Sequence, residues 1–322
     1  LMATNIKVTA RENVLVANNR INDAVTDEFE QPSYQIREPD GNITTLDNGT
    51  KVPFSYTNHY GISVNRFKDG SIIFEPLANP KNEPRLFRNG IIIRDNWVYH
   101  TMSVGIHASG KGLLIKDNVV LDEPDKRWYT GRFGLEPPYL NDPSRSPPNI
   151  TYENRAIDWS GQGVTVEGNT FEVYRHYLGD SQDQSVDGEG ILAQECCGGT
   201  QVKGARLRGN RGNSYIGIWK IPNVEDVQIS ENELRSNVTN TPLIYVNSDT
   251  NHQAHVMNDV RVERNMVEGD ILLKASLGGR NNAILANTGL TNSQIKASCH
   301  VSVRGNLGFT TAPCLESDSI DK

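Results

Sequence analysis

One short pattern returns along this chain at a spacing of about 22 residues, and it restricts the fold more than any other feature. It consists of an apolar residue, any residue, a second apolar residue, two further residues, an asparagine, any residue and a third apolar residue, as in "VQISENEL" at 227–234. The asparagines of the ten copies are Asn19, Asn65, Asn96, Asn118, Asn169, Asn210, Asn232, Asn265, Asn287 and Asn306. Such a period is typical of a solenoid, in which each repeat packs only on its neighbours.

A second short apolar segment lies between many of these asparagines. The segments are "GIHA" at 105–108, "GILA" at 190–193, "GIWK" at 217–220 and "LIYV" at 243–246. Apolar residues alternate in each of them, and alternation with a period of two residues is typical of a β-strand. Two or three short strands in every coil predict an all-β fold, a right-handed parallel β-helix solenoid with long loop insertions.

The asparagines are expected to hold this solenoid together. Its coils stack at about 4.8 Å, so that equivalent residues form columns. An asparagine at a turn tolerates left-handed or bridge backbone angles and can hydrogen-bond the asparagines above and below it. Leucine-rich repeats share the phrase, at periods of about 20–29 residues. However, the Val and Ile content, the second strands and the variable insertions favour the β-helix.

Two longer stretches, "GIHASGKGLLIKDN" and "GIWKIPNVEDVQISEN", resemble coils of the right-handed parallel β-helix, or pectin-lyase-like, superfamily. The resemblance covers residues 13 to about 309. Many members of that superfamily act on polysaccharides as lyases, hydrolases or epimerases, and others are adhesins or phage tailspikes. The chain lacks the Asn-Thr-Asp and Gly-His-Gly motifs of polygalacturonases and the Arg-x-Pro-x-x-Arg motif of pectate lyases. The resemblance is therefore one of scaffold, and a scaffold alone does not determine function.

The repeats run through nearly all of the chain, which predicts one solenoid domain over 1–322 with insertions at 22–58, 121–160 and 174–189. Because solenoid ends need caps, we expect further coils or another domain upstream. No run of 18 or more apolar residues occurs, so that no membrane span is predicted. The net charge of -7 argues against nucleic acid as a partner.

The four cysteines bear on the compartment. They are Cys196, Cys197, Cys299 and Cys314. A Cys299–Cys314 bridge would close a short loop and pin the last coil. It would also favour an oxidising compartment, so that we expect an extracellular or periplasmic protein. Free buried thiols are the alternative.

Insertions are the usual place for function on a solenoid, and the stretch "YRHYLGDSQDQSVDGEG" at 174–190 carries most of the polar chemistry. Its candidate residues are Arg175, His176, Tyr177, Asp180, Asp183, Asp187 and Glu189. A solvated polar loop without any function is the alternative interpretation.

The alternation of the second segments predicts which side chains face outward. If Ile106, Ile191, Ile218 and Ile244 point inward, then His107, Leu192, Trp219 and Tyr245 point outward. Exposed Trp219 and Tyr245 would mark an interaction surface, and aromatic faces stack well on sugar rings. Packing beneath an insertion is the alternative. Lys220 falls on an inward position, and a bulge would turn it outward, as a catalytic group or as a lysine that snorkels to the surface.

Two reactions fit these residues. In a hydrolase, Asp187 and Glu189 on one strand face would lie roughly 6.6–6.8 Å apart at the backbone, within the range of about 6.5–9.5 Å for inverting enzymes. In a lyase, Lys220 or His176 would remove a proton beside a uronic acid carboxylate that Ca²⁺ or a cation neutralises. Asp180 and Asp183 would supply oxygen ligands to calcium.

The predicted substrate is a polysaccharide on the outer face of the β-helix, contacted by Trp219, Tyr245, His107, Arg175, Tyr177 and Arg206. Arg206 belongs to the basic stretch "KGARLRGNRG", which would suit an acidic glycan. We expect a polysaccharide-degrading enzyme, a glycoside hydrolase or a polysaccharide lyase. The alternative is an adhesin or tailspike-like β-helix that binds a glycan and cleaves nothing.

Overall fold

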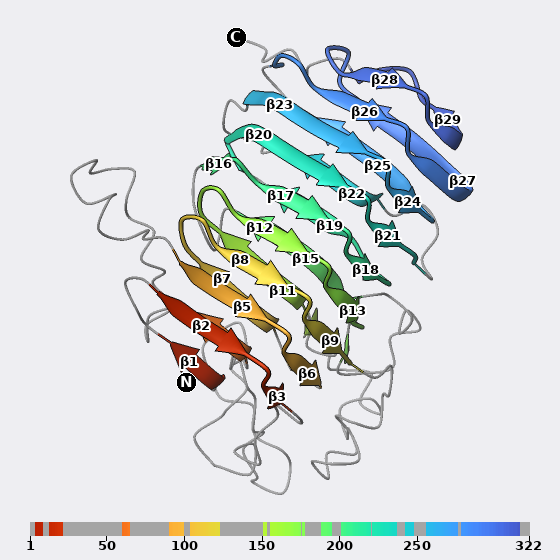
Figure 1. Ribbon diagram of the computed structural model, residues 1–322. Helices are drawn as coiled ribbons and strands as arrows, with labels where there is room; N and C mark the ends of the chain where they lie inside the picture. The colour runs from red at the N-terminus through yellow and green to blue at the C-terminus, as the bar shows by residue number, and fades with distance from the viewer. Residues whose placement is uncertain are drawn as a thin grey trace, which may run out of the picture.

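The computed structural model describes residues 4–8, 13–21, 60–64, 90–99, 104–122, 151–152, 155–174, 176–177, 188–194, 201–219, 221–236, 242–247, 256–275 and 278–315. These residues form 29 strands and no helix. Apart from one short antiparallel pair, the strands join in two large sheets of parallel strands. The protein is therefore all-β, and the stacking of its strands along one axis fits a β-helix-like solenoid (Figure 1).

The strands fall into three ladders. Ladder 1 is a ten-stranded sheet, in which β16 (Gln201–Lys203) also pairs with β20. Its other members are β2 (Val14–Ala17), β5 (Ile91–Arg94), β8 (Leu114–Lys116), β12 (Thr165–Glu167), β17 (Arg206–Arg208), β20 (Asn223–Ser230), β23 (Val256–Glu263), β26 (Ala283–Leu285) and β28 (Ser302–Arg304).

Ladders 2 and 3 together form the 17-stranded sheet, because the long strand β27 (Thr288–Ala297) pairs with the end of both. Ladder 2 contains β3 (Arg20–Ile21), β6 (Trp97–Tyr99), β9 (Val119–Leu121), β13 (Thr170–Glu172), β18 (Arg211–Gly212), β21 (Glu233–Leu234), β24 (Met266–Val267), β27 and β29 (Leu307–Thr311). Ladder 3 contains β1 (Thr4–Val8), β4 (Tyr60–Val64), β7 (Val104–Ser109), β11 (Arg155–Ser160), β15 (Glu189–Gln194), β19 (Ile216–Trp219), β22 (Pro242–Asn247), β25 (Asp270–Lys274) and β27.

Each predicted repeat spans a strand of ladder 1, a turn and a strand of ladder 2, and the predicted second segments lie in ladder 3. Three ladders exclude the leucine-rich repeat, which has one strand in each repeat. The copy assigned to Tyr60, Ile62 and Asn65 was wrong as a rung, because Tyr60–Val64 pairs with β7 in ladder 3. Its asparagine, Asn65, lies outside the described residues.

The core consists of columns of aliphatic side chains between the ladders. One column runs through Val16, Ile93, Ile115, Val166, Leu207, Ile229, Val262, Ile284 and Val303 of ladder 1. Its members are buried except for Val303 on the last coil. Burial of such columns in every coil stabilises the stack, since each buried aliphatic side chain contributes about 1.5–3 kcal/mol.

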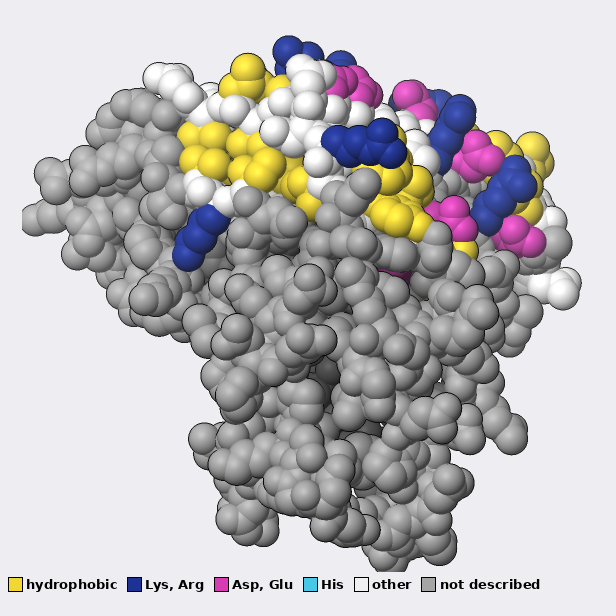
Figure 2. Space-filling view, turned by 90° about the horizontal axis from the view of Figure 1, so that it is seen from below, with side chains coloured by type: hydrophobic (Ala, Val, Ile, Leu, Met, Phe, Trp, Pro, Cys, Tyr) yellow, Lys and Arg dark blue, Asp and Glu magenta, His cyan; other side chains and the backbone are white. Residues whose placement is uncertain are grey.

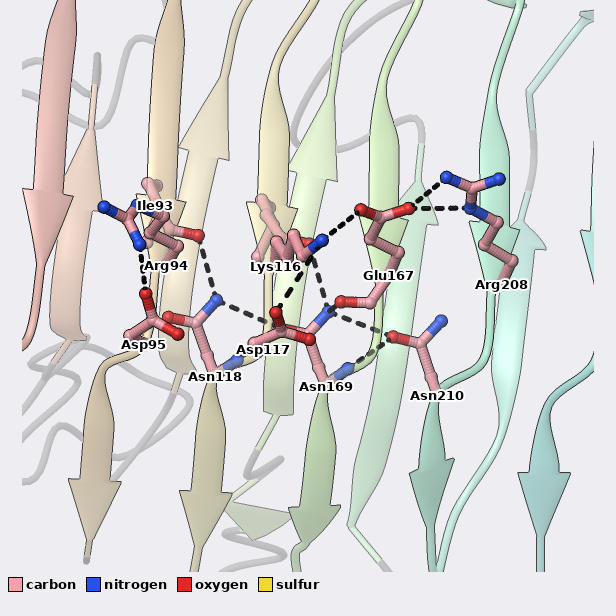
Figure 3. A network of polar contacts seen from close by, with 11 residues as sticks. Ile93, Arg94, Asp95, Lys116, Asp117, Asn118, Glu167, Asn169, Arg208 and Asn210 are labelled. Carbon is pink, nitrogen blue, oxygen red and sulfur yellow. Dashed lines mark hydrogen bonds and ion pairs between the residues drawn. The ribbon is translucent and has the colours of Figure 1, made fainter.

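Nine of the predicted asparagines form a continuous column at the turn between ladders 1 and 2. At each step the backbone N and Nδ2 of one asparagine donate to Oδ1 of the next, as from Asn169 to Asn210 at 3.1 and 3.0 Å (Figure 3). Nδ2 also donates to a backbone carbonyl of the preceding coil, as from Asn169 to Ile115 at 3.1 Å. The column contains Asn19, Asn96, Asn118, Asn169, Asn210, Asn232, Asn265, Asn287 and Asn306.

The left-handed residue of this turn is the one before the asparagine, not the asparagine itself as the sequence suggested. Its φ lies between 52° and 65° in every coil. The positions are Asn18, Asp95, Asp117, Gly168, Gly209, Glu231, Arg264, Ala286 and Gly305. The asparagine side chain needs its amide for the column, so that the sharp backbone turn falls on its neighbour.

Parts of two predicted insertions are regular structure. Residues 155–160 form β11 of ladder 3, although they lie within the insertion expected at 121–160. β10 (Thr151–Tyr152) and β14 (His176–Tyr177) form the antiparallel pair. The insertion expected at 22–58, and the stretches 123–150 and 178–187 of the other two, lie outside the described residues.

Cys299 and Cys314 form a disulfide near the end of the last coil, as one of the two readings of the sequence predicted. Backbone hydrogen bonds join the same two segments, since Leu315 donates to Ala297 at 2.8 Å. The bridge therefore fixes the chain where nothing further stacks on it within the described residues. In that part of the protein, no helix is long and apolar enough to cross a membrane.

Candidate functional site

Ladder 3 differs from ladder 1 because both of its faces are buried in the N-terminal half. All six residues of β7 and all six of β11 are buried, whereas buried and half-exposed residues alternate in β8. Ile106 and Ala108 belong to the core, so that His107 between them points to the outer face. The register places Asp158 of β11 beside His107.

His107 and Asp158 form a buried pair. Nδ1 of His107 lies 3.2 Å from Oδ2 of Asp158, and neither residue is more than 2% exposed. Nη1 of Arg155 donates to the same carboxylate oxygen at 3.3 Å. Charged groups at such depth are costly unless they are paired, so that these three side chains depend on one another.

Arg155 also binds Glu189 on the next coil. Nε of Arg155 donates to Oε2 of Glu189, and the two residues are partners in the register of β11 and β15. Burial alone would lower the pKa of Arg155, but the carboxylates of Asp158 and Glu189 outweigh it and raise this pKa above its ordinary value. The guanidinium therefore stays charged and holds a carboxylate on each side.

Tyr215 extends this arrangement toward the C-terminus. Its hydroxyl hydrogen-bonds Glu189, and burial, Tyr245 and Glu189 raise the pKa of Tyr215 well above 10. At neutral pH the phenol is therefore protonated and acts as a donor. The rings of Tyr215 and Tyr245 pack with centroids 5.1 Å apart at 55°.

These residues form one connected group, which we call the polar row. It comprises His107, Arg155, Asp158, Glu189, Tyr215 and Tyr245. It crosses β7, β11, β15 and β22 and reaches from fully buried residues at one end to two half-buried tyrosines at the other. Chemically it combines a His–Asp pair, a fixed guanidinium, a carboxylate that accepts two hydrogen bonds and an aromatic surface.

Trp219 does not occupy the column that the sequence assigned to it. The register pairs Tyr245 with Gly217 and pairs Trp219 with Asn247. Gly217 lies between Ile216 and Ile218, and both isoleucines fit the alternation. Alternation alone therefore does not tell which one lies in the column of Ile106. Trp219 still lies on the outer face of ladder 3 and is half-buried, one strand and two residues from Tyr245.

Arg206 lies elsewhere. It belongs to β17 on ladder 1, where its Nη2 donates to Oδ1 of Asp226 at 2.8 Å. The other three cations of the basic stretch also have carboxylate partners, the pairs being Lys203–Glu225, Arg208–Glu167 and Arg211–Glu233. Figure 2 likewise shows Lys and Arg side chains beside Asp and Glu side chains on the face that it presents. The basic stretch lies on ladders 1 and 2 and is therefore not part of the polar row.

Several predicted site residues fall outside the description. Asp187, Lys220, Arg175, Asp180 and Asp183 lie outside the described residues. His176 and Tyr177 are described only as the backbone of β14, where they pair with Tyr152 and Thr151. Their predicted roles remain predictions. Within the described ranges, no group of three or more His, Cys, Asp or Glu side chains could hold a metal ion.

Arg155, Asp158 and Tyr215 were not among the predicted site residues. The first two lie in "RAIDWS", which shows the alternation of the other ladder 3 strands but was read as part of an insertion. Its Ile157 matches Ile106 in the register. That match places Asp158 beside His107, a relation that a repeat alignment of this segment would have predicted.

The comparisons with known proteins add no relative. No protein-family model matches the chain, and no curated protein is similar to it. The function must therefore be argued from the site itself.

Proposed function

We propose that this chain is a right-handed parallel β-helix that binds a polysaccharide along the outer face of ladder 3 and degrades it by hydrolysis. The observation that carries the proposal is the polar row. It links Glu189, whose carboxylate Arg155 binds, through Tyr215 to the half-buried ring of Tyr245. Cleavage of a glycosidic bond requires a pair of Asp or Glu carboxyl groups, and Glu189 is proposed as one of the two.

In this proposal Glu189 is the base. Arg155 donates a hydrogen bond to its carboxylate and fixes its position, and a positioned carboxylate is the proposed acceptor of a proton from water. Asp187, two residues earlier, is the proposed acid that protonates the leaving oxygen. His107, Arg155, Asp158 and Tyr215 are the proposed positioning residues, and Tyr245 is the proposed contact to the sugar. Glu189 is itself only 5% exposed, so that access of water to its carboxylate is part of the proposal.

The basic stretch gives no support to elimination on ladder 3. A lyase needs a cation that neutralises a uronate carboxylate, and Arg206 had been the candidate. Since Arg206 lies on ladder 1 and pairs with Asp226, that support is lost. A lyase would then depend on Lys220 or His176 as base and on calcium bound by Asp180 and Asp183, all of which stay proposals.

A non-catalytic glycan-binding protein is the second candidate. It is favoured by the buried ion pairs, because Arg155 binds the carboxylates of Asp158 and Glu189 at the same time. In that case the row serves only to fasten β11 and β15 to one another. A secreted location is part of both candidates and is supported by the Cys299–Cys314 disulfide.

The test is an assay of the whole chain against neutral and acidic polysaccharides, with Ca²⁺ or with a chelator, that follows new reducing ends and the ultraviolet absorbance of unsaturated sugars. We expect reducing ends without absorbance. Glu189→Gln should abolish turnover and keep substrate binding, whereas Tyr245→Ala should weaken binding.

A matched control is Glu233→Gln, which removes a carboxylate that pairs with Arg211 and Arg235 on ladder 2. It should leave turnover unchanged. Absorbance that accompanies the reducing ends would identify a lyase. Binding without any product in the wild-type chain would establish the second candidate, and failure to bind any glycan would overturn both.

A further inference from the structure

Two lysines continue the outer face of ladder 3 beyond the aromatic residues. Tyr245 pairs with Leu272 of β25, which pairs with Lys296 of β27. Trp219 pairs with Asn247, which pairs with Lys274 of β25. Each lysine therefore lies two strands from an aromatic residue in the same column, roughly 10 Å along the stacking axis.

Both lysines point outward. Ile271, Leu273 and Ile295 belong to the core, so that Lys274 and Lys296, one position later on each strand, face the opposite side. Both are half-exposed. They are diagonal neighbours on adjacent strands, a relation that places two positions about 7–8 Å apart.

Lys296 is held in place by Asp270. Nζ of Lys296 donates to Oδ2 of Asp270 at 2.7 Å, and the backbone N of Gln294 donates to the other carboxylate oxygen at 2.8 Å. Asp270 is only 1% exposed, whereas the side chain of Lys296 is 36% exposed. The buried carboxylate thus fixes an ammonium group at the surface, and an ammonium has three hydrogen atoms to donate.

We propose that Lys274 and Lys296 form an anion-binding subsite for the same glycan, and that the natural substrate is an acidic polysaccharide that runs along the stacking axis of the coils. This inference rests on the proposed function. Sugar rings stack on Tyr245 and Trp219, and a carboxylate or sulfate further along the polymer meets the two lysines. An ammonium that is fixed before binding loses little freedom on contact, which favours affinity.

The two lysines also differ from the cations of ladder 1. Lys203, Arg206 and Arg208 lie on the outer face of another ladder, in β16 and β17, and pair with exposed or half-exposed carboxylates. Among the described residues, Lys274 and Lys296 are the Lys or Arg side chains that share the columns of Trp219 and Tyr245 within two strands of them. Lys7 also belongs to the column of Tyr245, but it lies on β1 at the far end of ladder 3. An anionic group on a glycan that lies along ladder 3 would therefore reach these lysines and not the basic stretch.

The test compares binding of the chain to polygalacturonate and to its fully methyl-esterified form, which have the same backbone and differ in charge, together with alginate, chondroitin sulfate and neutral galactan. We expect at least one acidic polymer to bind more tightly than the neutral ones, with an affinity that falls as salt is added. Lys274→Gln and Lys296→Gln should each lower that affinity about tenfold, and Lys296→Arg should retain it. Lys203→Gln is the matched control and should have no effect.

Thermal unfolding of each variant separates a folding defect from a binding defect, since Lys296→Gln leaves Asp270 without its cation. Equal affinity for acidic and neutral polymers, lost in Trp219→Ala but not in the lysine variants, would overturn the acidic subsite and leave the proposed function standing. No binding to any polymer would overturn the subsite together with the proposed function on which it rests.

Discussion

The ring of Tyr245 lies over Gly217, its partner on the neighbouring strand. A Cβ atom on Gly217 would come within 2.5 Å of Cζ of Tyr245. Because Gly217 has no side chain, the ring of Tyr245 can occupy this position and pack against Tyr215. Tyr215 in turn hydrogen-bonds Glu189. A glycine thus determines how the aromatic end of the polar row is presented.

Gly217→Ala should therefore displace the ring of Tyr245. We expect a loss of about 1–3 kcal/mol in the free energy of unfolding, as for other overpacked sites, together with weaker glycan binding. The measurements are denaturant unfolding and equilibrium binding. Adding Tyr245→Ala should relieve the clash, so that the two changes are strongly non-additive in stability. Additive effects would show that the ring does not depend on Gly217.

Arg155 should be a major determinant of stability. Arg155→Met leaves Asp158 and Glu189 buried without their cation, and we expect a loss of about 3–5 kcal/mol in the free energy of unfolding. The control is Arg264→Met, which removes an exposed guanidinium that pairs with Glu231 and Glu263 and should cost much less. If denaturant unfolding showed losses of similar size for Arg155→Met and Arg264→Met, the buried ion pairs of Arg155 would not be a major source of stability.

Replacement of an asparagine by alanine should destabilise the protein more in the middle of the asparagine column than at its end. Asn210 is fully buried and takes part in hydrogen bonds to Asn169, Asn232 and Val166. Asn210→Ala leaves several of these groups without partners, at about 1–3 kcal/mol each. Asn306→Ala at the half-exposed last position should cost much less. Equal losses in thermal or denaturant unfolding would contradict a cooperative column.

The strands of ladders 1 and 2 and the asparagine column between them could be predicted because they are periodic. Each copy of the pattern contains a core residue and, three residues later, an asparagine, as at Val16, Ile93 and Ile115. Every copy therefore predicts the same column of core residues again. The polar row has no such repetition. Asp158 meets His107 through a register that spans an insertion, so that only an alignment of the two ladder 3 segments, and neither residue alone, shows that they are near.

The strain at the left-handed residue before each asparagine can be tested by replacing alanine with glycine on one coil and glycine with alanine on another. Ala286 and Gly305 occupy equivalent positions on neighbouring coils, with φ of 53° and 65°. Ala286→Gly should remove a strain of about 1–2 kcal/mol, partly offset by the greater freedom of glycine in the unfolded chain. We expect a net gain of roughly 0.5–1 kcal/mol in the free energy of unfolding and a comparable loss for Gly305→Ala. If both variants had a lower free energy of unfolding than the wild-type chain, Ala286 would not be strained.

The ion pairs of Glu167 on ladder 1 should make a contribution to stability that falls measurably in acid. Burial would raise the pKa of Glu167, but hydrogen bonds from Arg208 and Lys116 outweigh it and lower this pKa below its ordinary value near 4.5 (Figure 3). The native state therefore binds this proton less readily than the unfolded chain, and the pairs add stability above pH 4.5 that is lost as the pH falls through the native pKa. Because the pairs are near the surface, we expect wild type to exceed Glu167→Gln by about 1 kcal/mol or less at pH 7. Denaturant unfolding should show this difference shrinking toward pH 3 and with added salt, and a difference that stays constant over that range would show that charge is not its cause.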